Sequence, residues 1–165
     1  MKLLCILRHA KSTWADSTIP DIDRPLDSAS KIQASSTGLF LKEKKIIPDA
    51  LYSSPAKRAI DSANLIADTL QLPHEKIILE PRVYEAQVDD LLSVVQNFPD
   101  KFNSVMLIGH NPGLSLLANY LAGIHINTLP TSGLCCFELS TDHWQEITLA
   151  ECKLLFTFSP HQTEE

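Results

Sequence analysis

Two histidines in this chain each follow an apolar run, and an arginine precedes the first of them. Residues 3–7 (LLCIL) lead into Arg8 and His9, and residues 104–108 (SVMLI) lead towards His110. A cation and an imidazole at the end of a buried strand are costly to hold there without a partner. The pair therefore indicates an anionic ligand beside a nucleophile or proton carrier. The alternative is an ordinary strand end with solvated polar residues.

Another cation stands at the start of an expected helix. Ser54 and Pro55 are typical of a helix N-cap and first helical position, which puts Lys57 and Arg58 in the first turn. The helix dipole favours anions at that end, so the two cations oppose it. A bound anion would remove the conflict, because the helix start and the guanidinium would attract the same group. A solvated surface pair is again the alternative.

If the strand ends align, Arg8, His9, Arg58 and His110 meet at the rim where open α/β sheets bind ligands. This set of groups matches what phosphoryl transfer needs. Two guanidinium groups can hold a phosphoryl group bidentately, and a neutral imidazole can attack phosphorus. A second imidazole can donate to the equatorial oxygens as charge develops. We expect no metal site and no cofactor, with the positive side chains acting in place of Mg²⁺.

Length and composition are those of one globular domain, which we expect to span residues 1–165, with 44% hydrophobic and 21% charged residues. The net charge of -6 argues against a nucleic-acid binder. It also makes the few arginines informative, and these are Arg8, Arg24, Arg58 and Arg82.

The cysteines show neither zinc-ligand spacing nor a disulfide framework, and they are Cys5, Cys135, Cys136 and Cys152. We expect them to be reduced and the protein to be cytoplasmic. The apolar run after Lys2 is too short for a signal peptide, and no stretch is long enough to span a membrane.

The elements that must position these groups alternate between strands and helices. This order predicts a three-layer α/β/α sandwich around a mostly parallel sheet. The expected strands are 3–7, 49–53, 76–79, 104–108 and 154–158, and the expected helices are 28–45, 55–70, 88–98 and 114–121. Residues 134–139 and 144–150 resemble a hairpin, and residues 13–24 form a long, polar loop of the kind that is often functional.

The first expected helix has a glycine among its apolar positions. Its apolar positions are Ala29, Ile32, Leu39 and Phe40, and Gly38 lies within it. A glycine inside a helix favours close packing, here against the sheet.

Four motifs occur in an order that resembles the histidine phosphatase superfamily, which contains the phosphoglycerate mutases. They are LRHAKS at 7–12, SSPAKRA at 53–59, YE at 84–85 and GHNPG at 109–113. The short chain, the DRPL sequence at 23–26 and the lack of a large helical insertion resemble the SixA-type phosphohistidine phosphatase branch. The resemblance implies a phosphoglycerate mutase-like fold.

The resemblance also implies roles for individual residues. His9 would be the nucleophile that becomes phosphorylated, in a phosphate pocket made with Arg8, Arg58 and His110. Glu85 matches the position of the general acid in many members, and Ser12 and Arg24 match positions of phosphate or substrate contact. A phosphohistidine substrate has a leaving imidazole with a pKa near 6.5, so a strong acid is less necessary and Glu85 could mainly orient groups.

Two departures bear on the substrate. Ala10 replaces the glycine of the commoner RHG motif and Lys11 replaces a frequent glutamate, which weakens the similarity to mutases of sugar phosphates. We expect a phosphatase that acts in signal transduction on a phosphorylated protein, such as a histidine phosphotransfer domain. A phosphatase for small phosphate esters and a non-catalytic phospho-ligand module are the alternatives. A short chain predicts an open pocket, and a deep one lidded by 13–24 and 124–133 would count against a protein substrate.

Overall fold

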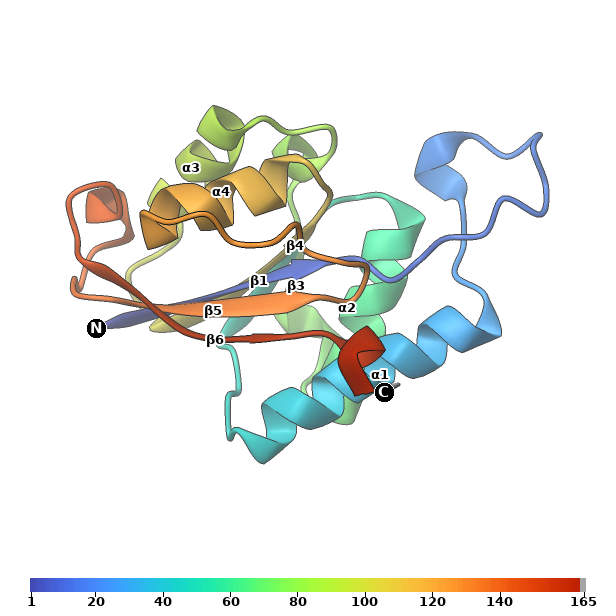
Figure 1. Cartoon of the computed structure of the whole chain (residues 1–165), viewed down its shortest axis with the longest axis horizontal. Coiled ribbons are helices and arrows are strands. Elements are labelled where there is room, and N and C mark those ends of the chain that lie inside the picture. The colour runs from blue at the N-terminus through green and yellow to red at the C-terminus, as the bar shows by residue number, and fades with distance from the viewer. Residues whose placement is uncertain (164–165) are drawn as a thin grey trace.

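The computed structural model describes residues 1–163, which form a six-stranded sheet with helices on both faces (Figure 1). The strand order is β3-β2-β4-β1-β5-β6. The strands are β1 (Lys2–Arg8), β2 (Ala50–Ser53), β3 (Ile77–Leu79), β4 (Ser104–Gly109), β5 (Leu134–Leu139) and β6 (Cys152–Phe158). The α-helices are α1 (Ser28–Glu43), α2 (Lys57–Thr69), α3 (Val88–Gln96) and α4 (Gly113–Ala122). Within these residues, no helix combines the length and apolar character needed to cross a membrane.

The central strands run parallel, so their carboxyl ends lie at one rim of the sheet. β1 pairs with β4 in a register that sets Arg8 beside Gly109, and β2 pairs with β4 in a register that sets Ser53 beside Ile108. β3 continues the parallel part, whereas β5 runs antiparallel to β1 and β6 antiparallel to β5. The expected mostly parallel sheet is confirmed.

Both faces of the sheet are covered, which explains the apolar run of β1. Leu4 and Ile6 pack in a core with residues of α3 and α4. Cys5 and Leu7 point to the opposite face and pack with residues of α1 and α2. Successive side chains of a strand alternate between faces, so only a fully apolar strand serves both layers. Figure 1 shows α3 and α4 above the sheet and α1 below it, the three-layer arrangement that was expected.

Helix α1 packs differently from the prediction. Ile32 and Leu39 are 69% and 53% exposed, whereas Ala34 and Leu41 are buried. A Cβ atom on Gly38 would stand 2.8 Å from Cβ of Thr69, so the glycine permits close contact with α2 rather than with the sheet. The helix therefore presents Gly38 to α2, buries Leu41 and leaves Ile32 and Leu39 exposed, which apolar spacing alone does not reveal.

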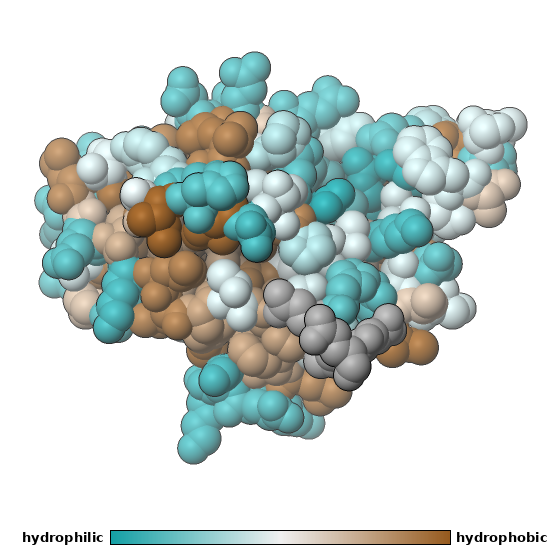
Figure 2. All heavy atoms as spheres, viewed as in Figure 1, coloured by the Kyte–Doolittle hydropathy of each residue, from teal (hydrophilic) through white to brown (hydrophobic). Residues whose placement is uncertain are grey.

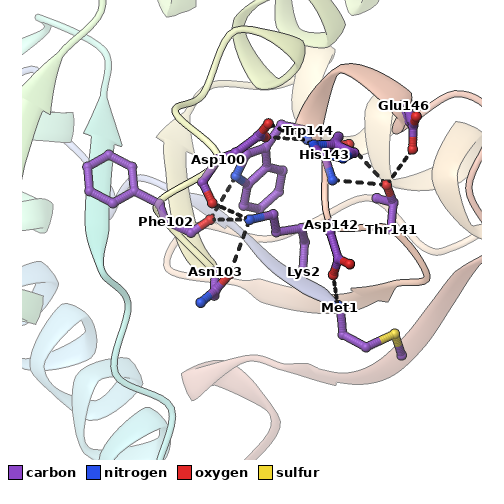
Figure 3. A network of polar contacts seen from close by, with 10 residues as sticks. All are labelled: Met1, Lys2, Asp100, Phe102, Asn103, Thr141, Asp142, His143, Trp144 and Glu146. Atoms are coloured by element: carbon purple, nitrogen blue, oxygen red, sulfur yellow. Dashed lines mark hydrogen bonds and ion pairs between the residues drawn. The ribbon is translucent and has the colours of Figure 1, made fainter.

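The predicted hairpin of 134–139 with 144–150 is wrong. β5 pairs with β6, and residues 144–146 form a short helical turn instead. The Trp144 side chain is fully buried, its indole N–H donates to the Phe102 carbonyl at 2.9 Å, and its backbone N–H donates to the Asp100 carboxylate at 3.0 Å (Figure 3). Burial of this large side chain at the amino end of the sheet determines the local structure.

Segment 13–24 leaves the sheet at the end of β1 and returns to α1. A bridge between Ser12 and Leu26 and a hydrogen bond from Thr13 N–H to the Pro25 carbonyl, 2.9 Å long, close its base. The segment extends beyond the carboxyl ends of the strands, in blue at the right of Figure 1. Its last part contains a short turn, Asp21–Asp23, at the sheet rim near α2.

Candidate active site

A cavity of about 300 Å³ lies at the carboxyl end of β1 and draws its walls from distant parts of the chain. Arg8 and His9 come from β1 and its end, Arg58 from α2, and His110 from the turn after β4. The imidazole centroids of His9 and His110 are 4.9 Å apart. The structure therefore brings together the residues that were expected to converge. We call this cavity the cationic pocket, and its other wall residues are Lys11, Ser12, Trp14, Arg24, Asn111 and Thr131.

His9 is held as a neutral imidazole. Its ring is buried, and Nδ1 lies 2.6 Å from the carbonyl oxygen of Ala10. Because a carbonyl only accepts, Nδ1 carries the proton and Nε2 keeps its lone pair. Burial, together with the charges of His110, Arg58 and Arg8, lowers the pKa of His9 to about 3. At neutral pH the imidazole is therefore unprotonated at Nε2.

His110 is held between a guanidinium and a hydroxyl. Nη2 of Arg58 lies 3.4 Å from Nδ1 of His110, and Oγ of Ser54 lies 2.8 Å from Nε2. Since a guanidinium only donates, Nδ1 accepts and Nε2–H donates to Ser54. Burial, followed by the charge of Arg58, lowers the pKa of His110 to about 4. An anion in the pocket would oppose both effects and favour a protonated, hydrogen-bond-donating His110.

The contact with Ser54 corrects a sequence expectation. Ser54 is not the N-cap of the helix, and Pro55 is not its first residue, because α2 begins at Lys57 after an Ala56 cap. Ser54 Oγ instead accepts from the Ala56 N–H at 3.1 Å and contacts His110. The serine thus supports the site rather than the helix start.

Two of the pocket arginines, Arg8 and Arg58, have unused hydrogen-bonding capacity. Nη1 of Arg8 donates to the Leu129 carbonyl at 3.1 Å. Within residues 1–163, the Nε atoms of Arg8 and Arg58 are both buried and have no hydrogen-bond partner. Buried donors on a charged group are costly to leave unpaired, and an anion would satisfy them.

Asp21 and Tyr84 are site residues that sequence reasoning missed. The Asp21 carboxylate accepts from Arg24, from Arg58 and from the Tyr84 hydroxyl, at 2.8, 3.1 and 2.6 Å. These bonds, chiefly the one from Tyr84, lower the pKa of Asp21 to about 2. Trp14 stacks on Arg24, with the guanidinium carbon 3.4 Å from the ring centroid. The spacing of Asp21 three residues before Arg24 is the one available sequence signal, and it is weak.

The pattern of the histidine phosphatase superfamily (branch 1) matches residues 4–96. The chain belongs to this superfamily. Its members are phosphatases or mutases, which supports an enzyme of the phosphatase kind. The match includes Arg8, His9 and Arg58. His110 lies beyond the matched residues, and the structure brings it to the same pocket.

Individual relatives extend the comparison. The chain is 34% identical over 112 residues to phosphoglycerate mutase 1 of Saccharomyces cerevisiae, covering 63% of this chain and 45% of that protein. It is 26% identical over 151 residues to an uncharacterized chloroplastic protein of Arabidopsis thaliana, covering 87% and 69%. The structure of the protein histidine phosphatase SixA complexed with tungstate superposes with a TM-score of 0.83 at 21% identity, covering 98% of this chain and 99% of that one. The fold is therefore that of SixA and of the phosphoglycerate mutases.

In this member of the superfamily, Ser12 and Arg24 lie in the wall of the cationic pocket, as the resemblance implied. Glu85 does not belong to that wall: its side chain is exposed, and its backbone has a φ of 55°. Its neighbour Tyr84 reaches the site instead, with its ring 5.5 Å from that of His110 in an edge-on arrangement. The acid role of Glu85 stays a prediction.

A larger cavity of about 380 Å³ lies beside residues 126–130 and the end of β6. Its lining is neutral apart from His161, and includes Leu129, Pro130 and Phe158. Figure 2 shows hydrophobic side chains gathered over β6 and the end of α4 on this face, whereas the surface towards segment 13–24 is mostly hydrophilic or neutral. Because phosphoryl chemistry needs cations and a nucleophile, we assign the active site to the smaller cationic pocket.

Proposed function

We propose that this protein hydrolyses phosphohistidine in a partner protein through a phosphorylated His9. The observation that carries the proposal is the neutral His9 imidazole, with its Nε2 lone pair available, beside two guanidinium groups whose Nε atoms are buried and have no partner in residues 1–163. This is the arrangement that attack on a phosphoryl group requires. Membership of the superfamily supports it.

In the first half-reaction, Nε2 of His9 attacks phosphorus and the bond from phosphorus to the substrate nitrogen breaks. The leaving imidazole takes up a proton from solvent water at the pocket mouth, and Nδ1 of His9 keeps its proton, hydrogen-bonded to the Ala10 carbonyl. Arg8 and Arg58 stabilise the charge on the transferring oxygens. His110, protonated when the dianion binds, donates to the same group.

In the second half-reaction, a water molecule attacks the phosphorus of phospho-His9. The bond between phosphorus and Nε2 breaks, the lone pair returns to the imidazole, and inorganic phosphate leaves with the water oxygen. The same cations stabilise this step, because charge develops on the same oxygens. The resemblance gives Glu85 the role of base here.

Two features support phosphohistidine as the substrate. Glu85 lies outside the pocket wall, and an imidazole leaving group depends less on a strong acid than an alkoxide does. Segments 13–24 and 124–133 contribute Trp14, Arg24 and Thr131 to the wall, but Trp14 is 68% exposed, so the mouth of the pocket lies at the surface. Such a mouth admits a side chain presented by a protein. A histidine phosphotransfer domain in a signalling system is the substrate we propose.

The free cysteines, three of them buried, fit a reducing compartment, and we include a cytoplasmic location in the proposal. The second candidate is a phosphatase for small phosphate esters. The 34% identity to a phosphoglycerate mutase favours it.

The test compares turnover of a phosphohistidine phosphotransfer protein, a phosphohistidine peptide and a panel of sugar phosphates that includes phosphoglycerates. We expect kcat/KM for the protein substrate to exceed that for every ester by more than about tenfold. A preference for one sugar phosphate would establish the second candidate instead. Absence of turnover and of an acid-labile phosphoenzyme would indicate a phospho-ligand binding module.

A further inference from the structure

One acidic residue, Asp21, joins two arginines of the cationic pocket to Tyr84. Oδ1 of Asp21 accepts from Nε and Nη2 of Arg24 at 3.1 and 2.8 Å. Oδ2 accepts from Nη2 of Arg58 at 3.1 Å and from the Tyr84 hydroxyl at 2.6 Å, and the backbone carbonyl accepts from Nη1 of Arg58 at 2.7 Å. The side chains of Arg24, Arg58 and Tyr84 thus all donate to Asp21.

Asp21 binds particular nitrogen atoms of Arg58 and Arg24 and leaves the others available. Asp21 takes both terminal nitrogens of Arg58, and a planar guanidinium held at two points has a fixed plane. The Nε of Arg58, buried and without a partner in residues 1–163, then has a fixed direction. On Arg24 the carboxylate takes Nε and Nη2 and leaves Nη1 unengaged by Asp21. Each arginine therefore keeps donor capacity that Asp21 does not occupy.

We infer that Asp21 is a positioning residue of the phosphoryl site: it fixes the guanidinium planes of Arg24 and Arg58 so that their remaining N–H groups face the transferring phosphoryl group. This role rests on the proposed function and gives the acidic turn of segment 13–24 a part in it. The opposite role is that of an internal competitor, which would occupy the arginines until a phosphoryl group displaces it. The Tyr84 hydroxyl favours positioning, because it secures Asp21 without using a donor of either arginine.

The charge of Asp21 adds a second effect, on His110. The groups that act on this imidazole are the cations Arg58 of α2, Arg8 of β1 and Arg24, together with Asp21 and the neighbouring rings of His9 and Tyr84. Burial and the three arginines lower the pKa of His110, and the Asp21 carboxylate raises it. Removal of the carboxylate charge should therefore make protonated His110 harder to form.

The test uses Asp21→Asn, with Asp23→Asn in the same turn as the matched control. Turnover of a phosphohistidine peptide is followed from pH 5 to 9, and binding of orthovanadate and inorganic phosphate is titrated separately. For Asp21→Asn we expect kcat to fall by about 10- to 100-fold while KM changes by less than about threefold, because misaligned groups affect the transition state most. Orthovanadate should bind about tenfold more weakly, with phosphate binding little changed. The pH dependence of kcat should shift to lower pH, and Asp23→Asn should behave as wild type.

Tighter phosphate binding with unchanged or faster turnover in Asp21→Asn would establish the competitor role and overturn the inference. If Asp21→Asn is poorly folded, Tyr84→Phe keeps the carboxylate on both arginines and removes one bond. It should lower kcat by several-fold with KM retained, and wild-type kcat in this variant would count against positioning. The vanadate titration needs no substrate. A protein that turns over neither phosphohistidine nor esters would refute the proposed function, while this titration would still decide the role of Asp21.

Discussion

Strand β1 carries a cation at each end, Lys2 buried and Arg8 half-buried, and the two are held in different ways. Lys2 begins the strand, is 2% exposed, and donates from Nζ to the carbonyls of Asp100 and Phe102 and to the side-chain oxygen of Asn103, at 2.6, 3.0 and 3.1 Å (Figure 3). Arg8 ends the strand, donates to one carbonyl at 3.1 Å, and keeps a buried Nε that no atom of residues 1–163 satisfies.

This difference distinguishes a cation that stabilises the fold from a cation that can bind a ligand. An ammonium has three N–H groups, and Lys2 has an oxygen for each, so nothing more can be bound there. Arg8 shares its end of the sheet with Arg58, whose Nε is also unpaired, and with two neutral imidazoles. The two ends are distinguished by whether the N–H donors of the cation all have acceptors within the protein. This distinction can be tested by substitutions at either end of β1.

The largest effect is expected for His9→Ala. Turnover should fall by on the order of 10⁵-fold, because no other group supplies the nucleophile. Stability should be kept or slightly raised, because a buried imidazole among cations is removed. His74→Ala is the control, since His74 is exposed and pairs with Asp68 on the surface. Turnover and acid-labile phosphoenzyme are measured in both, and phosphoenzyme formed in His9→Ala would contradict the assignment.

Arg58→Ala should have the next largest effect. Loss of one charged donor to a transferring group costs about 3–4 kcal/mol of transition-state stabilisation, so kcat/KM should fall by about 10²- to 10³-fold. Arg82→Ala is the matched control, because Arg82 is exposed and pairs with Glu80 outside the pocket. Steady-state kinetics of both variants on one substrate give the comparison. Equal, small effects would mean that the unpaired Nε of Arg58 has no part in the reaction.

The sequence was sufficient for the parallel part of the sheet and for the meeting of the central site residues at its rim, whereas the predicted hairpin was wrong. An apolar run that ends in a charged or imidazole group marks a buried strand and its functional end, and β1 and β4 both show it. Parallel pairing then requires those ends to share a rim, so the meeting of His9 and His110 followed from topology.

Other features depend on contacts that the local pattern does not encode. Asp21 is one of several aspartates in a polar segment, and only the return of that segment to the sheet rim brings it to Arg58 and Tyr84. Trp144 resembled a strand residue because aromatic residues favour strands, yet its burial against Phe102 fixes a helical turn. Ser54 resembled a helix cap because its type and the following proline fit one, and the nearness of His110 could not be seen.

At the amino end of β1, where each N–H group of Lys2 has an acceptor, Lys2→Met should lower the stability of the fold and leave turnover unchanged. Methionine keeps most of the apolar stem beside Trp144 but removes the ammonium donor from the Asp100 carbonyl and the Asn103 side-chain oxygen, while the Phe102 carbonyl keeps the indole N–H of Trp144. We expect the free energy of unfolding to fall by about 2–4 kcal/mol. Urea denaturation measures the loss, Lys101→Met provides an exposed control, and kcat of the folded variant should equal that of wild type. A large drop in kcat would remove the distinction between the two ends.

The two ends should also differ in their response to acid. His9 and His110 have pKa values lowered to about 3 and 4, so below pH 6.5 the unfolded chain binds protons that the native pocket does not. Stability should therefore fall as pH drops from 6.5 towards 4, by up to about 1.4 kcal/mol per pH unit for each imidazole. His143, beside Lys2, has its pKa raised by Asp100, so its contribution is present below pH 6.5 and is lost as pH rises through the folded pKa. Denaturation curves of His110→Asn and His143→Asn against pH should diverge in these opposite directions, and parallel curves would contradict the pocket assignment.

The smallest effect is expected for Glu85→Gln, and it depends on the substrate. Glu85 is exposed and lies outside the pocket wall, so its carboxylate has no place among the groups that hold the phosphoryl oxygens. With phosphohistidine the leaving imidazole accepts a proton readily near neutral pH, and kcat should change by less than about threefold. With an alkyl phosphate the leaving group is a poor one, and a proton donor is worth about 10²- to 10⁴-fold, so any role of Glu85 as acid would appear there. The test measures kcat of Glu85→Gln on both substrates. The control is Glu80→Gln, because the Glu80 carboxylate pairs with Arg82. A loss of 10²-fold on phosphohistidine would show that Glu85 reaches the leaving group after all, and that donors outside the cationic pocket join the reaction when substrate is bound.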